Sequence, residues 1–289
     1  MLLVPEFRCC LEEVLRIGDL AGAKPRHTVI GIVGRAADRQ LAWSKILAMI
    51  LFLIMAEPWR IARAQDVNPS NSPALTTQQV VESLVARNLQ RQQALQSFRG
   101  TRKYRAAYQG VGDRSAEMIV TVNYVSPDTK EFTIKSATGS KLIIDRVFKK
   151  LLEAEKEALN AAVQRRSALT EENYSFAMAG YEEGAAGARY VLSVEPRTKE
   201  KFLYRGRIWV DATDFAIVRL EAKPAKNPSF WTKNTDIVQV YQKLGDFWLP
   251  MHNSSVSSIR LGGHAELSIE YSDYEIKANR AIGVAESLH

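Results

Sequence analysis

Two aspartates that stand three residues apart, Asp211 and Asp214, have the residue types of an acid-base pair. They lie in the stretch GRIWVDATDFAIVRLEAKP, residues 206–224, between two runs of branched apolar residues. Paired carboxylates can act as general acid and base when both face a substrate in a cleft. In DATD, however, they would close a hairpin, where aspartate is favoured because its side chain accepts hydrogen bonds from nearby backbone amides. We therefore predict a turn here, and no catalytic residue.

Other residue types that do chemistry have the wrong spacing. The histidines that follow residue 64 are His252, His264 and His289, and no two of them have the HxH or HxxxH spacing of a zinc site. The stretch NSSVSS lacks the GxSxG nucleophile elbow, and GVGD lacks the Lys-Ser/Thr pair of a phosphate loop. Alternating Ser and Thr is ordinary on the wet face of a strand. We expect a protein that is not an enzyme and that uses neither a metal nor a cofactor.

The N-terminal part has the layout of a secretory signal. Basic residues precede an apolar run at 46–56 and small residues follow it, namely Arg35, Arg39 and Lys45 before the run and Ala62 and Ala64 after it. The run is shorter than the roughly 20 residues that cross a bilayer, so an uncleaved membrane anchor is the weaker alternative. We predict export through a signal that ends near Ala64, and an over-extended start before it.

Cleavage at that point would remove both cysteines, Cys9 and Cys10, so neither disulfides nor thiolate chemistry is expected in the exported chain. No cysteine follows the apolar run, so a lipid anchor has no acceptor there. The formal net charge is +7, but Lys and Arg alternate with acidic residues. Nucleic-acid binding requires basic residues gathered on one face. We therefore expect no nucleic-acid partner. We also expect the chain to be a monomer.

Two periodicities organise the rest of the chain. Residues 77–97 have helical spacing of apolar residues, with Thr76 or Thr77 as the cap, and so do residues 147–168. The apolar positions of the first helix, which we expect to be buried, are Val81, Leu84, Val85, Leu89 and Leu95. From residue 98 on, apolar and polar residues alternate in about ten strands joined by short turns.

The order of one helix, a few strands, a second helix and a long series of strands predicts an α+β fold that is mostly β. We expect a strongly curved antiparallel sheet, an open half-barrel of about ten strands, with the N-terminal helix and an inserted helical lid on its concave side. The predicted segments are an N-terminal extension with the signal at 1–64, a linker at 65–76, one domain at 77–278 and a tail at 279–289.

Three stretches carry a resemblance to a known family. They are EFTIKSATGSKLIIDRVFKKLLEAEKEA, FLYRGRIWVDATDFAIVRLEAKPAKNPSFW and GDFWLPMHNSSVSSIRLGGHAELSIEYSDYEI. With the order of helix, three strands, covering helix and long meander, they resemble the LolA/LolB/RseB superfamily of periplasmic lipoprotein-binding proteins, in the branch of outer membrane lipoprotein-sorting proteins. The chain has no lipobox cysteine, so the anchored role of LolB is not expected.

The resemblance implies a periplasmic carrier that shelters the acyl chains of lipoproteins or lipids in an apolar cleft. The alternative it implies is an RseB-like sensor, which would use the same cleft to detect lipoproteins and signal through a membrane protein partner. By strand parity and helical stripe, we predict that the cleft is lined by Met118, Val120, Val122, Phe132, Ile134, Phe148, Leu151, Leu152, Leu159, Val163, Leu192, Tyr204, Ile208, Val210, Val218, Leu220, Leu267 and Ile269. Phe230 and Trp231, in a loop between lysines, would form its mouth or meet a partner.

Overall fold

The computed structural model describes residues 75–279, except positions 111, 186, 201, 227–231 and 261. The predicted signal at 1–64, most of the linker, nearly all of the tail and the loop residues Phe230 and Trp231 lie outside the described residues. No helix among the described residues is both long enough and apolar enough to cross a membrane.

One antiparallel sheet of ten strands forms the framework, which confirms the predicted fold class. Its spatial order is β3-β2-β1-β10-β9-β8-β7-β6-β5-β4, so the sheet is open and β3 and β4 are its two edges. The elements in chain order are α2 (Thr77–Ala94), β1 (Leu95–Gln109), β2 (Arg114–Val125), β3 (Thr129–Gly139), α3 (Lys141–Ile143), the π-helical turn η3 (Ile144–Phe148), α4 (Lys149–Glu157), α5 (Ala161–Ser167), β4 (Tyr174–Gly184), β5 (Gly187–Pro196), β6 (Tyr204–Asp211), β7 (Ile217–Pro224), β8 (Thr232–Leu244), β9 (Phe247–Ile259) and β10 (His264–Ala278).

Helix α2 begins at a capping box. The Thr76 side chain accepts a hydrogen bond from the Gln79 amide, and the Gln79 side chain accepts one from the Thr76 amide at 2.9 Å. The helix ends at Ala94, three residues earlier than predicted, because Leu95 already pairs with Ala278 of β10.

Only the first half of α2 is buried against the sheet. Val81 and Leu84 are buried as predicted, together with Val80. The expectation was wrong for Val85, which is 36% exposed, and for Leu89, which is 53% exposed. The later turns of α2 are held instead by a polar contact, in which Arg91 Nε donates to the Asp246 carbonyl at 3.1 Å.

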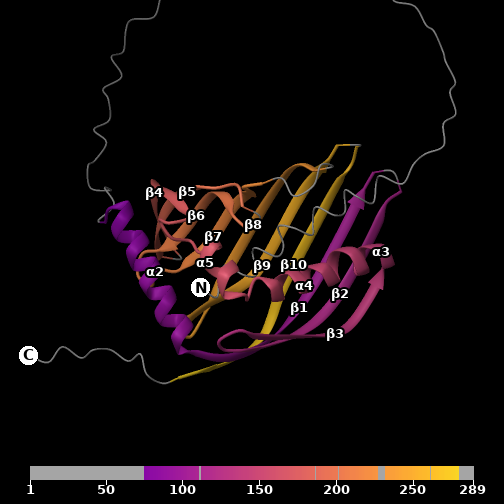
Figure 1. Cartoon of the computed structure of the whole chain (residues 1–289), viewed down its shortest axis with the longest axis horizontal. Helices are drawn as coiled ribbons and strands as arrows, with labels where there is room; N and C mark the ends of the chain where they lie inside the picture. The colour runs from indigo at the N-terminus through magenta and orange to yellow at the C-terminus, as the bar shows by residue number, and fades with distance from the viewer. Residues whose placement is uncertain are drawn as a thin grey trace, which may run out of the picture. The chain divides into compact units, whose positions relative to one another are not determined.

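The second helical region, residues 141–167, is called the lid below. It starts six residues earlier than predicted and is divided into several segments. Its last segment, α5, is separately capped by Asn160, whose side chain accepts a hydrogen bond from the Ala162 amide at 2.9 Å. Figure 1 shows α3, α4 and α5 crossing the strands on one face of the sheet. That face, which α2 also covers, is called the inner face.

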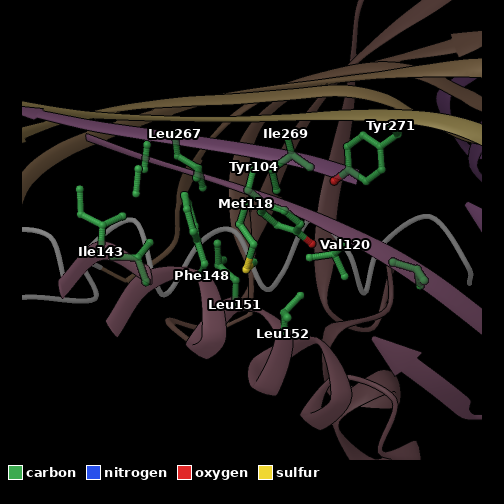
Figure 2. Packing of buried hydrophobic residues seen from close by; sticks show 14 of the residues in the cluster. Tyr104, Met118, Val120, Ile143, Phe148, Leu151, Leu152, Leu267, Ile269 and Tyr271 are labelled. Atoms are coloured by element: carbon green, nitrogen blue, oxygen red, sulfur yellow. The ribbon is translucent and has the colours of Figure 1, made fainter. Parts of the chain in front are cut away.

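Two apolar clusters occupy the inner face. The lid cluster joins β1, β2 and β10 to α3, η3 and α4; Figure 2 shows Phe148 and Leu151 of the lid directed at Tyr104, Met118 and Leu267. The α2 cluster joins Val80, Val81 and Leu84 to the inner side chains of strands β4 to β8. The core therefore consists of two separate parts, each with its own helical cover.

Candidate functional site

The predicted cleft residues do not form one continuous apolar surface. The lid cluster contains Met118, Val120, Val122, Phe148, Leu151, Leu152, Leu267 and Ile269, and the α2 cluster contains Leu192, Tyr204, Ile208, Val210 and Leu220. All of these side chains are buried. Strand parity therefore identified the inner face, but it could not indicate that the apolar residues divide into two groups.

Five predicted residues lie at the margins of these clusters. Phe132 and Leu159 are half-buried against the lid cluster, and Val163 and Val218 are buried outside both clusters. Ile134 is 42% exposed, which contradicts its predicted place in a dry cleft. Ile134 pairs with Val120 and so faces inward, but it lies on the edge strand β3, which has a neighbour on one side only.

The position of Val218 illustrates a limit of counting by parity. A bulge in the β6–β7 pair shifts the register, so Val210 lies opposite Ile217, whereas Ile208 lies opposite Leu220. Residues that pair directly share one face of a sheet. Ile217 therefore joins the α2 cluster in place of Val218.

A row of polar side chains separates the two apolar clusters. It consists of Thr235 and Gln239 on β8 and Asn253, Ser255 and Ser257 on β9, and each of these residues is at most 2% exposed. Across the sheet, Leu267 of the lid cluster pairs with Ser255, and Ser255 pairs with Ile237 of the α2 cluster. The row thus lies on the inner face, between the areas covered by the lid and by α2. We call these five residues the polar row.

Sequence reasoning missed the polar row because it placed the serines of NSSVSS on the solvent side. In the structure the apolar residue of that stretch, Val256, is 47% exposed, and its serine neighbours Ser255 and Ser257 are buried. The signal that could have revealed this inversion is parity, since Asn253, Ser255 and Ser257 stand at the same alternate positions as Ile259, which is buried in the lid cluster.

Most of the polar row is internally hydrogen-bonded. The hydroxyls of Thr235 and Ser257 lie 2.9 Å apart, and Asn253 Nδ2 donates to Gln239 Oε1 at 2.8 Å. Two atoms are exceptions: among the described residues, neither Asn253 Oδ1 nor Ser255 Oγ has a hydrogen-bond partner. Buried polar atoms are nearly always paired, so each exception needs an explanation.

A buried ionic cluster ties the lid to the sheet. Glu155 of α4 accepts hydrogen bonds from Arg102 of β1, at 2.7 Å, and from Lys130 of β3. All three side chains are buried, and the Arg102 guanidinium also lies 5.2 Å from the centre of the Tyr271 ring. Burial alone would raise the pKa of Glu155, but the two cations outweigh it and lower the pKa to about 2. The lid is therefore attached through a charged carboxylate inside an otherwise apolar contact.

The DATD stretch forms the predicted turn. Asp211 Oδ1 accepts hydrogen bonds from the amides of Thr213, at 3.0 Å, and Asp214, at 2.8 Å. Asp214 Oδ2 in turn accepts from Trp248 Nε1 at 2.9 Å and lies 2.6 Å from Lys243 Nζ. Burial acts to raise the pKa of Asp214, yet the bonds from Lys243 and Trp248 hold that pKa below its usual value. Asp214 therefore links the β6–β7 turn to β8 and β9, a role that the sequence did not indicate.

Other polar surfaces are weaker candidates for a ligand site. A shallow depression of about 530 Å³ crosses the opposite face of the sheet, but Glu117 in its lining is already paired with Arg105, at 3.1 Å, and with Lys103, at 3.0 Å. In the described part of the chain, no three His, Cys, Asp or Glu side chains gather as metal ligands would. The inner face is the better candidate, because it combines apolar area with unpaired polar atoms.

Comparisons with known proteins found only distant similarity. No protein-family model and no curated protein matches this chain. Among solved structures, a domain from Vibrio parahaemolyticus assigned to the outer membrane lipoprotein-sorting proteins is similar, with 12% identity and a TM-score of 0.36 over 73% of this chain and 94% of that one. A LolA superfamily protein from Nitrosomonas europaea is 11% identical, with a TM-score of 0.33 over 71% and 94%. The MucA/MucB complex from Pseudomonas aeruginosa matches at 9% identity and a TM-score of 0.25, over 70% and 100%. Because identities and TM-scores are this low, ligand and partner must be inferred from the chain's own residues.

Proposed function

We propose that this chain is an exported, periplasmic protein that binds the acyl chains of lipoproteins or lipids between its lid and the inner face of its sheet. It would bind its ligand without converting it. The observation that carries the proposal is the division of the inner face: two apolar clusters lie on one sheet, each under its own helical cover, with a row of buried polar groups between them.

The side chains with which the lid contacts the sheet are mostly apolar, which allows the lid to move away from the sheet. Its contact with the sheet is made by apolar side chains such as Val147, Phe148 and Leu151, which have no directional partners to lose. Burial of an acyl chain is worth about 0.8 kcal/mol per methylene, so a chain of roughly 14 methylenes gains on the order of 11 kcal/mol. This gain offsets part of the apolar contact that the sheet loses when the lid moves away, so a ligand can take the place of the lid.

The ionic cluster gives that exchange a defined latch. Glu155 is the lid residue that bonds both Arg102 and Lys130, and these two cations belong to two different strands. Breaking these contacts would leave α4 held to the sheet by its apolar side chains alone, without unpairing any strand. We infer that lid opening proceeds by release of Glu155, and that the rate of ligand entry depends on this contact.

Two measurements test the proposal. Native mass spectrometry of the protein purified from its own periplasm should detect bound lipid or a lipidated protein. Stopped-flow fluorescence with a dansylated C11 fatty acid should show faster association for Glu155→Gln than for the unchanged chain. The matched control is Asp145→Asn on the same lid, whose partner Lys149 is at the surface; its association rate should be unchanged.

The outcomes separate the parts of the proposal. A protein that carries no lipid from the periplasm and binds no acyl probe contradicts acyl-chain binding altogether. Binding with equal rates for both variants contradicts the latch alone. Crosslinking in intact cells then distinguishes the two roles implied by the sequence, because a carrier would capture lipoproteins, whereas a sensor would also capture one membrane protein partner.

A further inference from the structure

The orientation of the Asn253 amide can be deduced from its neighbours. Gln239 places one end of its side-chain amide against two backbone carbonyls, those of Val240 and His252, both at 3.2 Å. Carbonyls only accept hydrogen bonds, so this end must be the nitrogen, and the other end, which meets Asn253, must be the oxygen. Asn253 therefore directs its nitrogen at Gln239, at 2.8 Å. Its remaining polar atom, Oδ1, is a hydrogen-bond acceptor that has no donor among the described residues.

Ser255 supplies the complementary group. Its hydroxyl has no hydrogen-bond partner among the described residues, and its two cross-strand neighbours on the inner face, Ile237 and Leu267, are apolar. A hydroxyl in this setting is free to donate. The two unpaired groups stand two residues apart on β9, on the same side of the strand, and are thus roughly 6 to 7 Å apart along it.

A single chemical group satisfies both atoms. A trans secondary amide directs its N–H and its C=O to opposite sides, so one amide placed between the two side chains can donate to Asn253 Oδ1 and accept from the Ser255 hydroxyl. An ester of the same shape has the carbonyl but no N–H, and it would leave Asn253 Oδ1 buried and unpaired. Asn253 Oδ1 therefore favours an amide ligand over an ester ligand.

We propose that the polar row is the subsite for the amide of an amide-linked acyl chain, whose hydrocarbon lies on the apolar cluster next to it. This inference rests on the proposed function, since it names the linkage that the acyl-binding face recognises. Sites built to hydrogen-bond an N–H discriminate strongly against analogues that lack it. The chain would thus prefer N-acylated ligands to ligands that carry only ester-linked chains.

The test uses two probes that differ in one atom. N-propyl dodecanamide and propyl dodecanoate have the same chain length and differ by N–H against O. Each is titrated against the full chain loaded with the dansylated fatty acid, and displacement gives its affinity. We expect the amide to bind about tenfold more tightly, which is the value of one additional buried hydrogen bond.

Three variants test whether the preference arises at the polar row. Asn253→Leu removes the acceptor that only the amide N–H can use, so it should reduce the preference for the amide to about threefold or less. Ser255→Ala removes a hydroxyl that bonds no described residue and that can donate to either carbonyl, so it should weaken both probes and keep the preference. The control is Thr235→Val, which alters the same row at a hydroxyl already paired with Ser257 and should keep the full preference. Thermal unfolding of all three variants verifies that the sheet is intact.

Each outcome decides one question. Equal displacement by amide and ester, with both binding, overturns the amide subsite and leaves acyl-chain binding in place. A tenfold preference that survives in a folded Asn253→Leu also overturns the assignment to the polar row. Displacement by neither probe, in a chain that binds no fatty acid, overturns acyl-chain binding itself and the subsite with it.

Discussion

Arg102 and Glu155 form an ion pair of 2.7 Å between β1 and α4, and each residue is only 3% exposed. Charges at this depth lose their hydration, and the loss is offset only while every partner stays in place. Lys130 completes the arrangement by bonding the second oxygen of the same carboxylate. The stability of the lid should therefore depend strongly on one glutamate, and weakly on the many charges at its surface.

The first prediction concerns that glutamate. Glu155→Gln removes the negative charge that pairs with two buried cations, so the free energy of unfolding should fall by about 3 kcal/mol. The measurement is the urea midpoint at neutral pH, followed by circular dichroism. Asp145→Asn, which removes an exposed pair from the same lid, should change the free energy of unfolding by less than about 0.5 kcal/mol. If the two variants lowered the free energy of unfolding equally, the buried cluster would stabilise the protein no more than a surface ion pair does.

The second prediction concerns acid. The folded-state pKa of Glu155 is about 2, below its ordinary value of 4.5, so the folded protein binds this proton less readily than the unfolded chain. The stabilisation from this group is therefore complete above about pH 4.5 and is lost as the pH falls towards 2. Urea midpoints between pH 6 and pH 2.5, in roughly 0.5 M salt to screen surface pairs, should fall less steeply in Glu155→Gln than in the unchanged chain. If the urea midpoints of the two proteins fell equally with pH, the acid sensitivity could not be attributed to Glu155.

The third prediction concerns the β6–β7 turn. Asp211→Ala leaves the amides of Thr213 and Asp214 without their acceptor and should lower the free energy of unfolding by about 1 kcal/mol. The control is Asp236→Ala, which removes only an exposed pair with Lys223 and should be nearly neutral. Thermal unfolding of both variants makes the comparison, and a neutral Asp211→Ala would show that the turn does not need its side-chain bonds.

The fourth prediction concerns Gly206 in β6. A Cβ atom at this position would stand 2.1 Å from the carbonyl oxygen of Glu221 on the neighbouring strand, and the backbone φ is +154°. The β6–β7 pair would have to separate to admit it, so Gly206→Ala should lower the free energy of unfolding by about 2 kcal/mol or more. Gly180→Ala in β4 is the matched control, because an added Cβ there has no atom within 4 Å. Similar urea midpoints for the two variants would contradict this close approach.

The sequence was sufficient to predict the framework. Alternation over about ten segments identified the strands, and the two helical periodicities identified α2 and the lid. These patterns are local, so they can be interpreted without knowing what lies opposite. The same reasoning placed Met118 and Val120 on the inner face, where both are fully buried.

The candidate site was not predictable in the same way, because it depends on partners that are distant in the chain. Glu155 was not singled out from the sequence, because its partners Arg102 and Lys130 come from strands that lie 53 and 25 residues away. The polar row was missed for a related reason. Alternation assigns polar residues to the solvent side by default, and only the pairing of Ser255 with Leu267 and Ile237 reverses that assignment.

The two edges of the open sheet have one consequence for behaviour in solution. Both edge strands carry the extra residue of a bulge, Lys135 on β3 and Ala179 on β4, and exposed charges accompany them, such as Glu131 and Glu182. Irregular, charged edges are poor templates for a further strand. Copies of the chain should therefore not extend one another's sheets, and sedimentation at high concentration should still find single molecules.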